Sequence, residues 1–279
     1  MAMTNSPGTA APSNDARTGA LGSVLLCLGL FTAIPLPTAA VPTATRARSA
    51  AALRVLPVIG AGLGAAAGGV AVALLRGGSL LAAAAAIAVL TVLARGLHLD
   101  GLADLADGLG SHRSGPEALA IMRQSDIGPF GVGAVVLTVL LEVGAIAGLA
   151  HRDTRPQLVV AVAAAAAASR LAALTVATPR FPAAHPDGFG ALVAGSSGPA
   201  VRLGGAVLIA AATAAGGAAV GLGARAIAVS AVAVVAGQLT GYLTAWHAVR
   251  RLGGMTGDVF GACVEVALAT SLVVLAVGA

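Results

Sequence analysis

Three aspartates in a strongly apolar chain have the spacing of a cation-binding site. Asp100, Asp104 and Asp107 lie four and three residues apart in the segment LHLDGLADLADGLGSH, residues 97–112. At about 3.6 residues per turn they share one face of a helix, where unpaired carboxylates repel one another. A divalent cation relieves this repulsion, and oxygen ligands favour Mg²⁺, Mn²⁺ or Ca²⁺ over zinc. The pattern therefore favours a metal site over the alternative, a solvent-facing helix surface.

Two features beside these aspartates can extend such a site. His98 precedes them and has three open roles: metal ligand, proton acceptor, or hydrogen-bonded residue at a membrane interface. Arg123 and Asp126 precede a Gly-Pro pair at 128–129, which is typical of a helix start. Free N–H groups at a helix N-terminus bind anions, so this segment is either an anion site or an ordinary entry into the membrane.

Two further polar segments carry groups that bind phosphate. Residues 178–190, TPRFPAAHPDGFG, contain Arg180 and His185. Residues 250–258, RRLGGMTGD, form a glycine-rich turn with Gly254 and Thr256 that ends in Asp258. Such a turn can wrap a phosphate or add a metal ligand. Acids, arginines and this turn together indicate a site for a phosphate-containing substrate, and no Walker A sequence is present.

Three ionisable residues lie inside apolar runs, where charge is costly and usually functional. They are Arg170, Glu142 and Glu265. We expect the Arg170 side chain to reach the phosphate site from a depth of about 10 Å, at 1.5 Å of helix rise per residue. Glu265 can extend the same site, and Glu142 is expected to be structural.

The composition predicts an all-α, polytopic integral membrane protein. The 279-residue chain is 58% hydrophobic and 10% charged, with a mean hydropathy of +0.94, whereas soluble domains carry about 25% charged residues. We expect a disordered tail over residues 1–18 and a single membrane-embedded catalytic domain over 19–279. Seven or eight hydrophobic helices are expected, because the first apolar run is short. The runs are 19–34, 55–75, 79–97, 127–150, 157–177, 203–223, 226–249 and 259–279.

The arginines predict which side of the membrane holds the polar segments. All sixteen basic residues are arginine, and ten lie in the loops 35–54, 95–126, 178–202 and 250–258. By the positive-inside rule these loops converge on the cytoplasmic side, with the protein in the plasma membrane. The seven aromatic residues lie near helix ends on this side, as an interfacial belt or as the lining of a pocket for a bulky, partly apolar substrate. The arginines form no stripe, so no nucleic acid partner is expected.

Four segments carry a family resemblance. They are HLDGLADLADGLG (98–110), ALAIMRQSDIGPFGV (118–132), SRLAALTVATPRFPAAHPDGFG (169–190) and RRLGGMTGDVFGACVE (250–265). Together they resemble the cobalamin synthase family, the adenosylcobinamide-GDP ribazoletransferases, over about residues 24–265. The resemblance implies a membrane enzyme of late vitamin B12 assembly that needs Mg²⁺. Such an enzyme joins adenosylcobinamide-GDP to α-ribazole or its 5′-phosphate and releases GMP.

The resemblance also gives the candidate residues their roles around a Mg²⁺ ion that bridges the substrate diphosphate. Membrane lipid is an expected partner, and a homo-oligomer is possible. The expected metal ligands are Asp100, Asp104, Asp107, Asp126 and Asp258; the expected catalytic residues are His98, Asp104 and Asp107; the expected substrate-binding residues are Arg113, Arg123, Arg170, Arg180, His185, Gly254 and Thr256.

Two other functions remain open from the sequence. DLADG at 104–108 partly matches the acidic motif of the CDP-alcohol phosphotransferases of phospholipid synthesis, but the Ala-Arg that follows DG in that motif is absent. A non-enzymatic cation or metabolite transporter places acids near the middle of the bilayer on opposed repeats. The aspartates of this chain lie outside the apolar runs.

Overall fold

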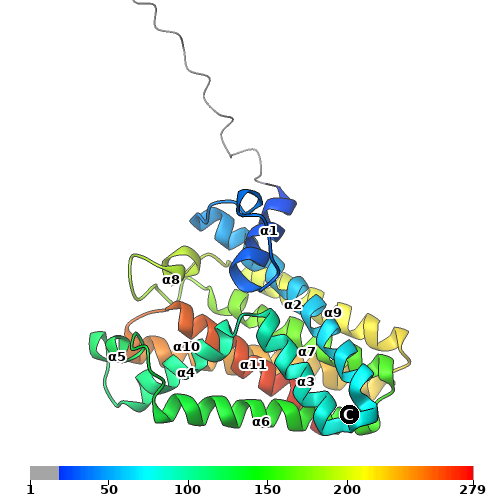
Figure 1. Ribbon diagram of the computed structural model, residues 1–279. Coiled ribbons are helices and arrows are strands. Elements are labelled where there is room, and N and C mark those ends of the chain that lie inside the picture. The colour runs from blue at the N-terminus through cyan, green and yellow to red at the C-terminus, as the bar shows by residue number, and fades with distance from the viewer. Residues whose placement is uncertain (1–18, 279) are drawn as a thin grey trace, which may run out of the picture.

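The protein consists of helices and loops over residues 19–278, which are the residues that this computed structural model describes (Figure 1). The all-α prediction is confirmed, and the tail predicted at residues 1–18 lies outside the described residues. The helices are α1 (Ala20–Phe31), α2 (Arg46–Leu74), α3 (Ser79–Leu93), α4 (Leu97–Gly110), α5 (Pro116–Ile121), α6 (Pro129–Arg152), α7 (Arg155–Val176), α8 (Phe189–Val193), α9 (Pro199–Ala219), α10 (Ala224–Leu252) and α11 (Gly257–Gly278).

Six of the described helices are long and apolar enough to cross a membrane, namely α2, α6, α7, α9, α10 and α11. Each corresponds to one predicted apolar run. The run at 79–97 differs, because α3 ends at Leu93 and α4 leaves it at an angle of 89°; counting this bent pair as one span gives seven. The run at 19–34 contains a 12-residue helix. At 1.5 Å per residue that helix is about 18 Å long, shorter than the roughly 30 Å hydrocarbon core.

The bend before α4 comes from two consecutive residues with left-handed backbone conformation. Arg95 has a φ of 58° and Gly96 a φ of 68°. Residues other than glycine rarely adopt such angles, so Arg95 marks a turn that the surrounding structure holds in place. The turn carries α4 off the axis of α3 and lays it against α6 and α11. For this reason α4 is not one of the six spans.

The centre of the bundle is formed by α7 and α11, and α2 packs closely on α7. Gly60, Gly64 and Gly68 of α2 lie along this contact. A Cβ on Gly64 would lie 2.7 Å from the carbonyl oxygen of Val162, and one on Gly68 would lie 2.9 Å from the Cα of Val159. Small residues at such spacing let two membrane helices approach to backbone contact. This contact fixes α7, which carries Arg170.

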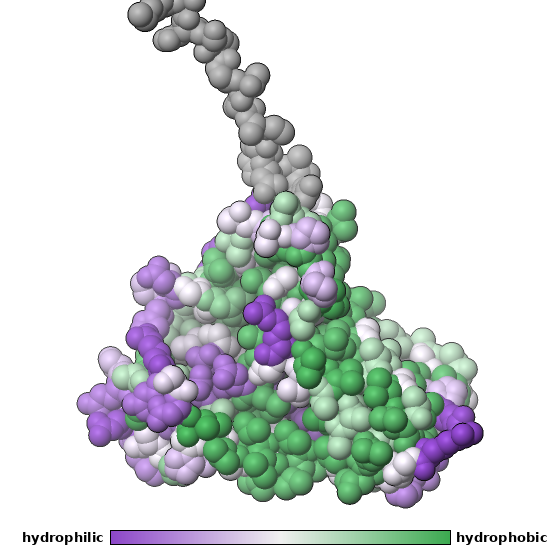
Figure 2. Space-filling model, in the orientation of Figure 1, coloured by the Kyte–Doolittle hydropathy of each residue, from purple (hydrophilic) through white to green (hydrophobic). Residues whose placement is uncertain are grey.

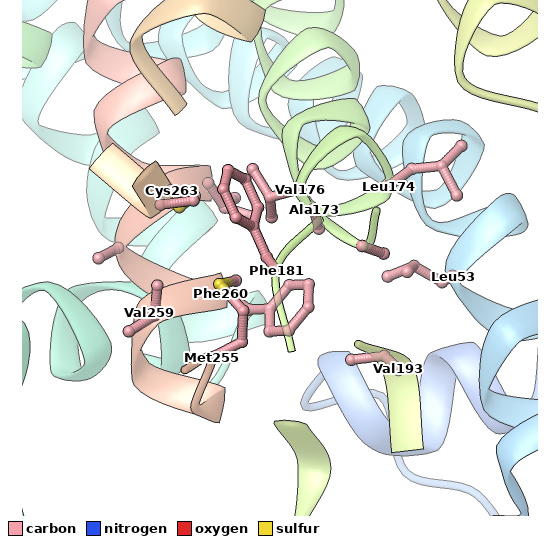
Figure 3. Close-up of a cluster of buried hydrophobic side chains, with 14 of the residues drawn as sticks. Leu53, Ala173, Leu174, Val176, Phe181, Val193, Met255, Val259, Phe260 and Cys263 are labelled. Carbon is pink, nitrogen blue, oxygen red and sulfur yellow. The ribbon is translucent and has the colours of Figure 1, made fainter. Parts of the chain in front are cut away.

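A hydrophobic cluster joins α7 and α11 to α2 and α8. Phe181, Met255 and Phe260 gather beside α7 and α11, and Leu53 and Val193 face them from α2 and α8 (Figure 3). Each of these side chains is no more than 3% exposed. The cluster therefore holds the loop after α7 and the turn before α11 in fixed positions.

The outer surface is divided into an apolar flank and a polar end. Hydrophobic residues cover the flank along α6, whereas hydrophilic residues gather over α5, α8 and the neighbouring loops (Figure 2). Val136, Leu137 and Leu140 of α6 and Val235 and Leu239 of α10 are each at least 50% exposed. Apolar surface of this extent is typical of helices that face lipid.

Backbone and arginine hydrogen bonds tie the arginine-rich loops together at the polar end. Arg46 of α2 donates to the carbonyl oxygens of Ala191 and Ala194, both at 2.6 Å. Arg251 of α10 donates to the carbonyl oxygen of Arg113 at 2.8 Å. The predicted convergence of these loops is confirmed.

Candidate active site

The acidic helix α4 lies against the first turn of α11. A Cβ on Gly101 would lie 2.6 Å from the carbonyl oxygen of Asp258 and 2.9 Å from its Cα. Only glycine allows a helix to approach another backbone so closely. The contact brings Asp258, which is distant in the sequence, to the side of α4 that carries Asp100 and Asp104.

Negative charge is concentrated around Asp104. Partial burial raises the pKa of Asp104, and repulsion by Asp258, Asp100 and Asp107 adds to the shift, which reaches about 6. Four of the five predicted metal ligands are therefore near enough to act on one another. The fifth, Asp126, is exposed and lies on the wall of an open cavity of about 630 Å³ that Asp104 and Asp107 also line.

Asp107 holds the start of α6. Its Oδ2 accepts the N–H of Gly128 at 2.7 Å, and its Oδ1 accepts the N–H of Gly131 at 2.8 Å. A carboxylate at a helix N-terminus is stabilised by these N–H groups and by the helix dipole. Of the two alternatives for this N-terminus, an anion site or an ordinary entry into the membrane, neither is decided; the structure shows the protein's own carboxylate bound to two of the N–H groups.

A polar cavity of about 150 Å³ lies beside Asp258 and is lined by Arg123, His185 and Thr256. The guanidinium of Arg123 contacts Nε2 of His185. The Thr256 hydroxyl donates to Oδ2 of Asp258 at 3.2 Å. Three segments that the sequence separates widely thus contribute their predicted phosphate-binding and metal-binding groups to one cavity.

The glycine-rich turn before α11 is held by backbone pairing with the loop after α7. The N–H of Met255 donates to the carbonyl oxygen of Pro182 at 2.7 Å, and the N–H of Ala184 donates to that of Met255 at 3.0 Å. Gly254 is buried beneath this pair, where a Cβ would lie 2.6 Å from the Cα of Ala184. The structure therefore gives Gly254 a packing role that positions Thr256, and its phosphate contact stays a prediction.

A second cavity of about 290 Å³ shares Asp258, Gly257 and Phe189 with the polar one. Asp100, Asp258 and His98 line one part of it, and the remaining lining is mostly apolar. Asp258 lines both cavities and therefore lies between them. His98 thus lies near Asp100 and Asp258, and its three possible roles stay open.

Two predicted substrate arginines lie apart from the aspartates. Arg113 forms an exposed ion pair with Glu117 at 2.9 Å, on the wall of the open cavity of about 630 Å³. Arg180 is exposed and lines none of the three cavities that contain aspartates. Arg113 can therefore contact a substrate in the open cavity. Arg180 has no comparable position beside the aspartates.

Arg170 lies in the interior of the bundle. Its side chain is 2% exposed and lines a cavity of about 10 Å³, together with His98, Glu142 and Glu265. It donates to the Ser169 hydroxyl at 2.9 Å, and both carboxylate oxygens of Glu142 are buried without a hydrogen-bond partner among the described residues. Glu265 and Glu142 compensate the charge of Arg170 inside the bundle. That Arg170 binds substrate stays a prediction, which this interior position does not favour.

The aspartate cluster fits a hard divalent cation in its chemistry. All of its candidate ligands are carboxylate oxygens, and a cation relieves the repulsion that adds to the effect of burial on the pKa of Asp104. Among the described residues, no three acidic, histidine or cysteine side chains are grouped closely enough to hold an ion by themselves. A cation here would take further ligands from water or from a substrate phosphate, which is the usual arrangement for Mg²⁺.

Comparison with known proteins identifies the family. The family model described as cobalamin-5-phosphate synthase matches residues 23–276. The chain belongs to this family. The resemblance that the four segments carry is thereby confirmed. The two alternative classes, the CDP-alcohol phosphotransferases and the transporters, are set aside in favour of the cobalamin-5-phosphate synthase family.

Three curated relatives that share most of their length with this chain are each named adenosylcobinamide-GDP ribazoletransferase. The protein of Frankia casuarinae is 44% identical over 72% of this chain and 73% of its own length. That of Mesorhizobium japonicum is 36% identical over 92% and 93%, and that of Chlorobaculum tepidum is 32% identical over 88% and 91%. No solved structure matches the chain.

The interior position of Arg170 predicts that its loss affects folding before it affects substrate binding. Arg170→Met leaves Glu142 and Glu265 without their cation, and breaking a buried charge group in this way costs about 3–5 kcal/mol. We expect a large drop in thermal stability in detergent, largely restored when Glu142→Gln and Glu265→Gln are added. If Arg170→Met left the stability unchanged and raised the KM for the diphosphate substrate, the result would contradict this interior role and support substrate binding by Arg170.

Proposed function

We propose that this chain joins adenosylcobinamide-GDP to α-ribazole, or to its 5′-phosphate, and releases GMP in the late assembly of cobalamin. The observation that carries the proposal is the proximity of Asp100, Asp104 and Asp258, of which Asp258 lines both a polar and an apolar cavity. The family and the names of its curated relatives support the same reaction. In this proposal the polar cavity and the apolar cavity each bind part of a substrate, and the diphosphate lies at the aspartates.

The reaction forms a bond from a ribose hydroxyl oxygen of the acceptor to the phosphorus on the cobinamide side of the diphosphate. The bond from that phosphorus to the bridging oxygen breaks, and GMP leaves with the oxygen and its electron pair. The hydroxyl proton must pass to a base, for which Asp104, Asp258 and His98 are the candidates beside the cavities. Arg123 lies near Asp258 in the polar cavity and offsets charge on the departing phosphate.

Mg²⁺ is the cofactor that we propose. Carboxylates of Asp100, Asp104 and Asp258 would hold it together with water or substrate phosphate oxygens, since no three side chains of the described residues are close enough to hold an ion alone. When bound, it supplies positive charge that neutralises the diphosphate oxygens. The role of Asp107 is then to fix α6 beside the site through its two backbone hydrogen bonds. Asp126 and Arg113 face the open cavity, where they can contact the outer part of the donor substrate.

We also propose that the polar end faces the cytoplasm and that the protein lies in the plasma membrane. The arginine-rich loops support this orientation through the positive-inside rule. Lipid would then cover the apolar flank formed by α6 and α10. A homo-oligomer stays a prediction.

The proposal is tested by measuring GMP release from adenosylcobinamide-GDP and α-ribazole with the detergent-solubilised protein, with and without Mg²⁺. We expect Mg²⁺-dependent release that falls on the order of 100-fold in Asp104→Asn and in Asp258→Asn, because each removes charge from the site of phosphoryl transfer. Asp153→Asn is the control, since Asp153 follows α6 at the other end of the bundle. Near-wild-type release by both site variants would contradict the assignment of the active site.

Activity is expected to fall as the pH decreases through about 6, the raised pKa of Asp104. Below that value the carboxyl is protonated and loses the negative charge that attracts a cation. Protons and Mg²⁺ compete for the same carboxylate, so a higher Mg²⁺ concentration should move the inflection to lower pH. Rates are measured against pH at two Mg²⁺ concentrations. If the pH of the inflection does not change with the Mg²⁺ concentration, or if the inflection persists in Asp104→Asn, the titrating group is not Asp104.

A further inference from the structure

The apolar cavity of about 290 Å³ has an aromatic wall built from three helices. Phe31 of α1 and Phe189 of α8 meet edge to face, with ring centroids 5.4 Å apart and planes at 84°. Phe189 and Phe260 of α11 repeat this arrangement at 5.9 Å and 81°. Edge-to-face aromatic groups of this kind form rigid walls that receive another flat ring.

The rest of the cavity is aliphatic except at one end. Leu53 and Leu56 of α2 and Ala173 of α7 are part of its aliphatic lining. Asp100, Asp258 and His98 supply its polar groups. Leu53 and Ala173 are buried in the hydrophobic cluster, where Figure 3 shows them beside Phe260. An occupant that suits this lining is flat and apolar over most of its surface and polar where it meets the carboxylates.

The apolar cavity adjoins the polar one at the point of reaction. Phe189, Gly257 and Asp258 line both cavities, and Arg123 and Thr256 line the polar one only. A molecule in the apolar cavity would therefore place its polar end beside a phosphate bound next to Asp258. This is the arrangement that an acceptor needs in order to present a hydroxyl group to a diphosphate.

We propose that the apolar cavity binds the dimethylbenzimidazole base of α-ribazole, with the ribose directed at Asp100 and Asp258. This inference rests on the proposed function and assigns the acceptor subsite within it. The base is a flat bicycle with two methyl groups and no exocyclic hydrogen-bonding group, which matches the aromatic and aliphatic walls. Its volume suits the cavity of about 290 Å³, which lies near the lower end of the roughly 300–1,000 Å³ range of small-molecule sites.

The two other large groups in the reaction match this cavity poorly. Guanine carries several donors and acceptors on its edges, and an apolar wall would leave them unpaired at a cost of about 1–3 kcal/mol each. The corrin macrocycle with its amide side chains is much wider than one nucleoside base. Both groups belong to the donor, for which the open cavity of about 630 Å³ offers more room.

The test separates the acceptor from the donor by their KM values. Phe31→Leu removes one aromatic contact, and we expect it to raise the KM for α-ribazole about tenfold while the KM for adenosylcobinamide-GDP stays near that of the wild type. Equilibrium dialysis of α-ribazole alone should show the same loss of affinity. Trp246→Leu is the matched control, an aromatic-to-leucine change on α10 where Trp246 stacks with Arg250 outside the cavity lining.

A second variant tests the shape of the cavity. Ala173→Leu adds volume to its wall, so we expect it to lower kcat/KM for α-ribazole more than for the riboside of unmethylated benzimidazole. A raised KM for adenosylcobinamide-GDP in these variants, or an acceptor KM and selectivity that neither variant changes, would overturn the assignment. These outcomes can be read only if the wild-type enzyme is active. A wild-type protein that releases no GMP when both substrates are present would contradict the proposed function itself.

Discussion

Repulsion between carboxylates that the backbone forces together is the constraint on which this site depends. The close contact between Gly101 of α4 and the backbone of Asp258 sets the separation of the two acidic segments. Partial burial, together with the repulsion that results from this contact, raises the pKa of Asp104 to about 6. A protein can afford such a cluster only where protons, a cation or a ligand complex neutralises it. The polar cavity that contains Arg123 lies beside this cluster. A diphosphate and its cation bound there could neutralise the aspartates.

A second group of charges lies deeper and is balanced differently. Glu142, Glu265 and Arg170 belong to α6, α11 and α7, the helices that also support the aspartates, and they are almost fully buried. Here the protein supplies its own cation. His98 lines both the small interior cavity and the apolar cavity at the aspartates, so the two groups of charges meet at this residue of α4. The interior group can thus hold α4 in place while the outer one stays open to substrate.

Much of the fold and part of the site could be predicted from sequence. Six apolar runs became six long helices, and the spacing of Asp100, Asp104 and Asp107 placed them on one helix because both features depend only on local periodicity. The bend at Arg95 could not be predicted, since it depends on a backbone conformation that arginine rarely adopts. The depth of Arg170 along its helix also did not show that its side chain lies inside the bundle, beside two acids. Distance along a helix does not specify direction, and the acids that hold Arg170 inside the bundle lie on other helices.

The other features of the site that the sequence did not predict depend on contacts between distant segments. Asp107 caps α6 because the loop that follows α4 folds back and places Gly128 and Gly131 next to it. The aromatic wall combines Phe31, Phe189 and Phe260 from three separate segments. The sequence showed only that the aromatic residues share one side of the protein, as a belt or a pocket lining. Neither contact has a local sequence signal, so each required the three-dimensional structure.

The central claim, that the crowded aspartates bind a divalent cation jointly with a substrate diphosphate, is tested most directly by electron paramagnetic resonance of Mn²⁺ added to the purified protein. The account predicts one bound Mn²⁺ per chain, tighter binding when adenosylcobinamide-GDP is present, and loss of that binding in an Asp104→Asn, Asp258→Asn double variant. Mn²⁺ binding that is absent with the substrate present, or that is unchanged in the double variant, would contradict it.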